Sequence, residues 1–157
     1  NLRSEIKVAV RCHFDLPVVI DVPKNLDDGT PFPTMFWLTC PMYIKKVSTL
    51  ESHGMVKELD NQLNRNKKLR KLWSKRQKSY EKERNRKYKS VNNTVSPIGG
   101  VGGAVNSIKC LHSHLADELV TGKNIVGQIV LENVGGCNCN EPCVLEGTKN
   151  DNWRSEW

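Results

Sequence analysis

The chain has 157 residues, of which 26% are charged and 38% are hydrophobic, and its formal net charge is +7. This length is typical of one domain with one modest core, and no apolar run reaches the roughly 20 residues that a membrane span needs. The positive charge is concentrated, because residues 60–90 hold 13 Lys and Arg against 3 Asp and Glu. Electrostatic arguments about a partner therefore concern this one segment.

The first quarter of the chain predicts a small sheet. Residues 6–10 alternate between apolar and polar or small side chains, which is typical of a strand with one buried face. The apolar run at 17–23, bounded by prolines, and the aromatic run at 35–38 predict two more strands. A helix is then expected to begin at Pro41 and to end at Gly54, since proline suits a first turn and glycine a helix end.

The rest of the chain predicts helices. Residues 55–89 form a long basic helix or a helical hairpin, in which a narrow apolar stripe is surrounded by Lys and Arg. Another helix is expected at 107–120, and residues 126–131 fit either strand or helix. We predict an α+β fold in which a single domain spans 1–147, with the basic helical segment projecting from it and 148–157 forming a polar tail.

Six cysteines are many for a chain with no visible export signal. In a reducing cytosol, clustered cysteines are more often metal ligands or catalytic thiols than disulfides, so we expect a cytoplasmic protein. Cys137, Cys139 and Cys143 lie in one loop, but their spacing matches neither a C-x2-C zinc knuckle nor a ferredoxin run. Metal ligands, disulfide partners and unpaired thiols remain three interpretations. If only one or two of these thiols ligate, Cys143 is the first choice and Cys137 the second.

Cys110 and His114 lie four residues apart in the predicted helix, where their side chains would share one face. Such a pair is a reasonable half of a zinc site. The competing interpretation makes Cys110 a small buried hydrophobe and His114 a surface residue. His112 is expected to point into solvent. A further hypothesis is a thiol-dependent enzyme, with Cys110 or Cys40 as nucleophile and His114 or His112 as base.

Two more cysteines lie at the ends of predicted elements. Cys12 ends the first strand, and Cys40 precedes a helix, where backbone amides favour a thiolate. Three tail thiols leave a tetrahedral ion one ligand short, so we predict that the tail loop closes over a site prepared by the other cysteines. The leading hypothesis is therefore a cysteine-ligated metal site that holds zinc or an iron–sulfur cluster, between which the sequence does not distinguish. The candidate ligands are Cys12, Cys40, Cys110, Cys143, Cys137, Cys139 and His114.

The basic segment suggests an alternative function, the binding of nucleic acid or another polyanion, because Lys and Arg release counterions from phosphate. The competing interpretation is a solvated helix whose aromatic residues lie on its buried stripe. The candidate polyanion-binding residues are Lys67, Lys68, Arg70, Lys71, Lys75 and Arg76.

Four stretches, "RCHFDLPVVI", "DGTPFPTMFWLTCP", "KCLHSHLADEL" and "NIVGQIVLE", resemble the bacterial family catalogued as domain of unknown function 501. The resemblance covers roughly residues 10–145. One departure is that Asp15 stands where the family pattern usually has glycine. The resemblance implies no activity, but its motif stretches contain the same Cys12, Cys40 and Cys110 that the physical argument selects.

Overall fold

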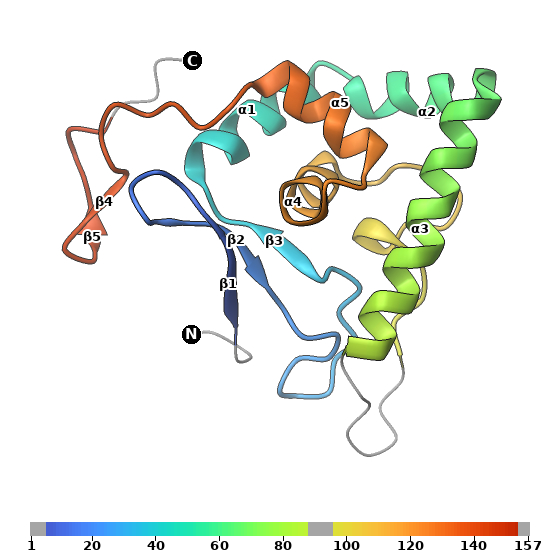
Figure 1. Ribbon diagram of the computed structural model, residues 1–157, viewed down its shortest axis with the longest axis horizontal. Coiled ribbons are helices and arrows are strands. Elements are labelled where there is room, and N and C mark those ends of the chain that lie inside the picture. The colour runs from blue at the N-terminus through green and yellow to red at the C-terminus, as the bar shows by residue number, and fades with distance from the viewer. Residues whose placement is uncertain (1–5, 88–95, 154–157) are drawn as a thin grey trace.

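The computed structural model describes residues 6–87 and 96–153 and confirms the predicted α+β fold (Figure 1). Within these ranges the strands are β1 (Lys7–Arg11), β2 (Pro17–Asp21), β3 (Phe36–Leu38), β4 (Val144–Leu145) and β5 (Thr148–Lys149). The helices are α1 (Pro41–Ser52), α2 (Met55–Arg65), α3 (Lys67–Lys87), the short 3-10 helix η1 (Val101–Gly103), α4 (Leu111–Thr121) and α5 (Ile125–Val134).

The three-stranded sheet is antiparallel in the order β1–β2–β3, with Val19 opposite Leu38 in the β2–β3 pair. Both of these residues are buried, as is Val18, whereas the edge strand β1 is mostly exposed. Helix α4 packs across all three strands, so the core lies between the sheet and the helices (Figure 1).

The turn between β1 and β2 positions Cys12. The backbone N–H of Cys12 donates to the carbonyl of Leu16, and its carbonyl accepts the N–H of Asp15, both at 2.9 Å. Asp15 has a φ of 59°, in the left-handed region that glycine adopts most readily. The glycine that the family pattern usually has at this position would suit this turn, and Asp15 adopts the left-handed backbone conformation that the turn requires.

Helices α4 and α5 approach each other closely at a glycine. A Cβ atom on Gly127 would lie 2.2 Å from the carbonyl oxygen of His114, which is far inside van der Waals contact. Residues 126–131, which fit strand or helix by sequence, are helical, because Asn124 caps α5 by accepting the N–H of Gly127.

The basic segment forms two helices. Asn66 has an extended backbone between α2 and α3, and its side chain accepts the N–H of Leu69 at 3.0 Å. Helix α3 buries Trp73 and Tyr80 against the body of the protein, so it lies along that body instead of projecting from it. Residues 88–89 of the predicted segment lie outside the described ranges.

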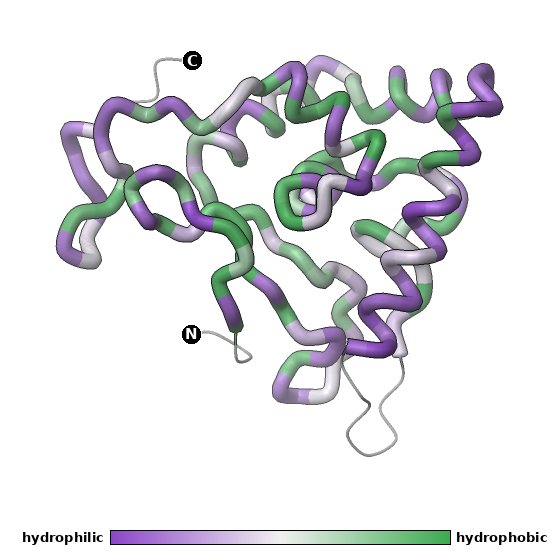
Figure 2. Tube along the Cα trace, in the orientation of Figure 1, coloured by the Kyte–Doolittle hydropathy of each residue, from purple (hydrophilic) through white to green (hydrophobic). Residues whose placement is uncertain are grey.

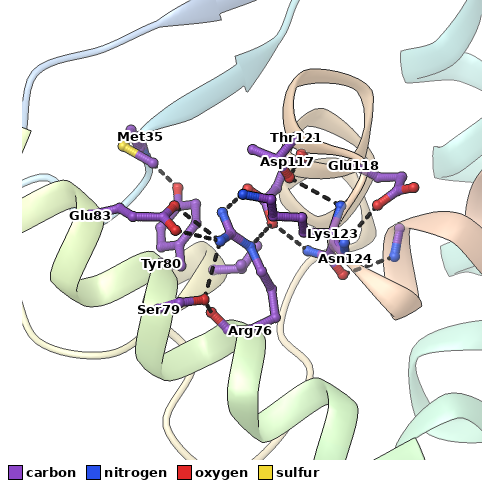
Figure 3. Close-up of polar contacts among 12 residues, drawn as sticks. Met35, Arg76, Ser79, Tyr80, Glu83, Asp117, Glu118, Thr121, Lys123 and Asn124 are labelled. Carbon is purple, nitrogen blue, oxygen red and sulfur yellow. Dashed lines mark hydrogen bonds and ion pairs between the residues drawn. The ribbon is translucent and has the colours of Figure 1, made fainter.

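A buried ion pair joins α3 to α4 (Figure 3). The guanidinium of Arg76 donates to both oxygens of Asp117, at 2.7 and 2.8 Å, and the two side chains are 3% and 0% exposed. Asn124 also donates to the Asp117 carboxylate, at 2.8 Å, and Arg76 reaches Glu83 at 3.0 Å. The network therefore locks the beginning of α5 against α3 and α4.

Arg84 is a second buried cation of α3. Its side chain is 0% exposed, and its guanidinium donates to the backbone carbonyls of Pro33, Pro97 and Gly99. Arg84 thus connects the last turns of α3 to the loop between β2 and β3 and to the segment that precedes η1.

In the part of the chain that the structure describes, no helix combines the length and the apolar character that crossing a membrane requires.

Candidate metal centres

Glu51, Cys110 and His112 come together where the last turn of α1 meets the first turn of α4. We call these three residues the pocket group. Cys110 is the N-cap residue of α4, with an extended backbone (φ −150°, ψ 119°), and His112 follows in the first turn. Glu51 lies near the end of α1, and the two helices pack against each other.

The three side chains of the pocket group point their ligand atoms at one another. Nδ1 of His112 lies 3.9 Å from Sγ of Cys110 and 3.3 Å from Oε1 of Glu51. All three atoms lie within 4.8 Å of one another, and no other three Cys, His, Asp or Glu ligand atoms in residues 6–87 and 96–153 come so close.

Surrounding groups orient each ligand atom of the pocket group. Nε2 of His112 lies 3.2 Å from the carbonyl oxygen of Ile44 and 3.2 Å from the hydroxyl of Ser48. Because a carbonyl only accepts, we assign the ring proton to Nε2, which leaves Nδ1 to face the other two ligands. Oε1 of Glu51 accepts the backbone N–H of Leu111 at 2.6 Å.

Cys110 and His112 shift each other's pKa values in opposite directions. Contact with Cys110, opposed by burial and supported by Glu51, raises the pKa of His112 to about 9. Burial works to raise the pKa of the Cys110 thiol, but hydrogen bonds from His112 and Ser113 outweigh it and lower that pKa.

A pocket of about 310 Å³ opens beside this group. Cys110 and His112 line one part of it, and the rest is mainly apolar and aromatic. Trp37, which is 52% exposed, stacks on Phe32 at a ring separation of 5.4 Å. The other apolar walls are Phe36, Leu38 and Ile44. An ion in the pocket group would therefore be reachable from solvent by a small molecule.

The other five cysteines gather at the opposite end of α1, and we call them the sulfur group. They are Cys12, Cys40, Cys137, Cys139 and Cys143. All six cysteines of the chain are among the described residues, and none forms a disulfide.

The sulfur group brings together three segments. Cys40 is the N-cap residue of α1, and its thiol interacts with that of Cys137. Sγ of Cys139 lies 3.8 Å from Sδ of Met42 in the first turn of α1. The β1–β2 turn joins them, since Nε2 of His13 lies 2.9 Å from the carbonyl oxygen of Cys139.

Cys110 does not join Cys12 and Cys40, although the sequence predicted one shared site. Cys40 begins α1 and Glu51 lies eleven residues later, which at about 1.5 Å per residue separates the two groups by roughly 16 Å. Helix α1 therefore has five cysteines near its start and the single thiol of the pocket group near its end.

The predicted pairing of Cys110 with His114 is also corrected. Cys110 is the cap of α4 and lies outside its helical turns, so the two side chains do not share a helix face. His114 is fully buried, and its Nδ1 lies 3.0 Å from Oδ1 of Asn124, in the network of Arg76 and Asp117. Burial lowers the pKa of His114.

Sequence reasoning missed two members of the pocket group. His112 was expected in solvent, and Glu51 was not considered. The Cys-x-His spacing of Cys110 and His112 could have indicated that the two side chains meet. Using it would have required the prediction that Cys110 is extended and that the helix begins at Leu111. No local pattern marks Glu51, because α1 and α4 are distant in sequence.

The predicted polyanion-binding residues divide into three kinds. Four of them, Lys67, Lys68, Lys71 and Lys75, are exposed on α3. Arg70 is half-buried and lies over the ring of Trp73, at 4.8 Å. Arg76 is buried in its ion pair with Asp117 and presents no charge to a partner, so this part of the prediction is corrected.

The fold and these groups define a small α+β protein with one cysteine beside a pocket and five cysteines around a helix start. The chain belongs to the DUF501 family: the family model described as "Protein of unknown function (DUF501)" matches residues 8–132. The match ends before the three tail cysteines, and thus earlier than the resemblance to residue 145 suggested. Neither the curated proteins nor the solved structures include a match to this chain.

Proposed function

We propose that the protein is a zinc-binding protein in which Glu51, Cys110 and His112 hold one ion. The observation that carries this proposal is the spacing of the three ligand atoms. Zinc bonds of about 2.0–2.3 Å at tetrahedral angles place neighbouring ligand atoms roughly 3.3–3.6 Å apart. Two of the three separations, 3.3 Å from nitrogen to oxygen and 3.9 Å from nitrogen to sulfur, agree with this to within a few tenths of an ångström, and the third is within 4.8 Å.

Direct hydrogen bonds explain these separations less well. A charged N–H···O bond is about 2.7–2.9 Å long. The 3.3 Å between Nδ1 of His112 and Oε1 of Glu51 is longer than that and fits two ligands of one cation better. The outer contacts also fit a metal site, because a ligating histidine typically donates its other N–H to a carbonyl, and a ligating carboxylate is itself hydrogen-bonded. His112 meets the first condition at Ile44, and Glu51 meets the second at Leu111.

Three protein ligands leave a tetrahedral zinc ion with one open position, which is the arrangement of catalytic rather than structural zinc sites. A zinc ion bound there supplies a Lewis acid that polarises a bound group or activates water. Cys110 and His112 face the pocket, so its aromatic walls would hold an apolar substituent next to that open position. The protein is thus suited to a metal-dependent reaction on a small molecule with an aromatic or aliphatic part.

Replacing His112 or Glu51 with glutamine is expected to remove one zinc equivalent per chain. Losing even an outer contact weakens metal sites 10–100-fold, so losing a ligand should weaken zinc binding by about 100-fold or more. Glu51→Gln keeps an oxygen for the Leu111 N–H, which limits any effect on folding. Zinc content after loading and buffer exchange, with a competing chelator to give the affinity, measures this.

His53→Gln is the matched control, since His53 is an exposed histidine just after α1 and lies outside the pocket group. The proposal fails if the wild-type protein and His112→Gln hold the same amount of zinc. Alkylation of Cys110 adds a second readout. Zinc should protect this thiol, whereas rapid alkylation of a zinc-saturated sample would favour the thiol-dependent enzyme.

A second candidate function, nucleic-acid binding, is supported by the arrangement of exposed cations on α3. At 100° per residue, seven of them fall within one arc of about 100°, opposite the buried face of Trp73 and Tyr80. From Lys67 to Arg86, a separation of 19 helical steps, this basic stripe is about 28 Å long, and neither acidic residue of the helix lies within it. Figure 2 shows the hydrophilic character of α3. The stripe consists of Lys67, Lys68, Lys71, Lys75, Lys78, Lys82 and Arg86.

Replacing Lys71, Lys75 and Lys78 with glutamine is expected to weaken binding to a single-stranded RNA and to flatten its salt dependence. Each phosphate contact contributes about 0.7 to the slope of log affinity against log salt, so the slope should fall by roughly 2. Fluorescence anisotropy at several salt concentrations measures it.

The control for the basic stripe replaces Lys57, Lys109 and Lys123, which are exposed lysines on other elements, and removes the same net charge. Equal loss of affinity in the two triple variants would show that overall charge, and not the stripe, drives binding.

A further inference from the structure

We propose that the sulfur group is a second metal centre that holds an iron–sulfur cluster at the N-terminus of α1. Its thiols are those of Cys12, Cys40, Cys137, Cys139 and Cys143. The site is separate from the pocket group, lies at the other end of the same helix and does not depend on the proposed zinc ion.

The convergence of five thiols from three segments is the first argument. A β-turn supplies Cys12, a helix cap supplies Cys40, and the tail loop supplies the other three. Cys12, Cys137 and Cys139 pack against the core cluster that contains Cys40. Sγ of Cys139 lies 3.8 Å from Sδ of Met42, two residues after Cys40, and Nε2 of His13, next to Cys12, lies 2.9 Å from the carbonyl oxygen of Cys139.

The tail loop is held in place over this site. Lys46 of α1 donates to the carbonyl of Val134 at 2.8 Å, where the tail leaves α5. His13 contacts the carbonyl of Cys139, and Asn150 bonds to the backbone of Cys143 at 3.1 Å and of Pro142 at 2.8 Å. The tail thiols are therefore positioned by contacts of the folded chain before any metal is considered.

The sulfur atoms of this group do not meet the requirement for a single zinc ion. Zinc–sulfur bonds of about 2.3 Å would place tetrahedral sulfur ligands roughly 3.8 Å apart. Within the described ranges, the pocket group is the one set of three ligand atoms within 4.8 Å, so no three sulfur atoms of the sulfur group are that close. A cluster spreads its thiolates over several iron atoms and so accepts wider separations.

The surroundings would stabilise such a centre. Cys40 lies at the positive end of the α1 dipole, where anionic ligands are favoured. Sδ of Met42, which is fully buried, lies against Sγ of Cys139 and joins the site to the core.

The test is metal analysis of protein reconstituted without oxygen with iron and sulfide. The wild-type protein should be brown, with broad visible absorption and with iron and acid-labile sulfide in similar amounts. Cys12→Ser should abolish both signals, and so should Cys40→Ser. Cys12 is only half-buried, so its variant should fold, as circular dichroism will confirm. Serine variants of the three tail cysteines then show which of them ligate.

Cys110→Ser is the matched control, because it removes a cysteine from the pocket group alone. It should keep the iron and sulfide and lose the zinc, whereas Cys12→Ser should do the reverse. The cluster is refuted if the reconstituted protein is colourless, if it holds zinc but no sulfide, or if folded Cys12→Ser keeps its iron. Cys12→Ser leaves the pocket group intact, so a Cys12→Ser protein that holds no zinc would refute the proposed zinc site and not the cluster.

Discussion

Replacing Asp117 with alanine is expected to lower the free energy of unfolding by about 3–5 kcal/mol, because it leaves a buried guanidinium without its carboxylate. Arg76 and Asp117 are 3% and 0% exposed and are joined by two hydrogen bonds. The Asn124 amide, which caps the neighbouring helix, would lose its acceptor as well. For a chain of this length the melting temperature should fall by roughly 6–20 °C.

Thermal and urea unfolding, followed by circular dichroism, measure this effect. Glu132→Ala is the control, since Glu132 is an exposed acid on α5 and its loss should change stability by about 0.5 kcal/mol or less. A double variant, Arg76→Met with Asp117→Leu, should lose less stability than the two single variants added together. An Asp117→Ala protein as stable as the control would show that the pair contributes nothing to folding.

Replacing Arg84 with methionine is expected to destabilise the protein by about 3 kcal/mol or more, because buried carbonyl groups left without donors each cost about 1–3 kcal/mol. The guanidinium binds the carbonyls of Pro33, Pro97 and Gly99, and its side chain is fully buried. Burial lowers the pKa of Arg84, but a guanidinium remains charged in proteins.

Arg84→Lys tests whether charge or geometry matters. A lysine keeps the charge but lacks the planar fork, so it should not restore the three bonds and should destabilise the protein as well. Arg86→Met is the control, because Arg86 lies two residues away on the exposed side of the same helix. Hydrogen exchange should speed up at residues 97–104 in both Arg84 variants, and an unchanged exchange rate there would contradict the role of Arg84 in holding this loop.

Local physics was sufficient for much of the fold. Pro41 begins α1 as predicted, and the helix ends at Ser52, two residues before the predicted Gly54, because a missing N–H and a left-handed backbone act within one or two residues. The alternation of residues 6–10 marks a strand for an equally local reason. The start of α4 was placed too early, since Cys110 is extended and the helix begins only after it.

The grouping of the candidate ligands needed the tertiary structure. The start of α4 at Leu111 instead of the predicted residue 107 takes Cys110 out of the helix and makes His112, in place of His114, its partner. Glu51 enters the pocket group only because α1 packs against α4. Spacing within one helix carries no information about a contact between two helices.

The charges of α3 show the same division. Helical spacing and the abundance of Lys and Arg predicted a basic face. The structure shows that Arg76 and Arg84 belong to the interior, where carboxylate and carbonyl groups from distant elements receive them. Composition alone treats all arginines alike, whereas burial depends on which side of the helix meets the body.

By itself, the sequence determined the elements, the concentration of positive charge and the placement of cysteines at element ends, because these follow from local hydrogen bonding and periodicity. Only the tertiary structure decided that the cysteines form two groups, since α1 separates its two ends by roughly 16 Å. Packing of α1 against α4 builds one group, and closure of the tail over the β1–β2 turn builds the other.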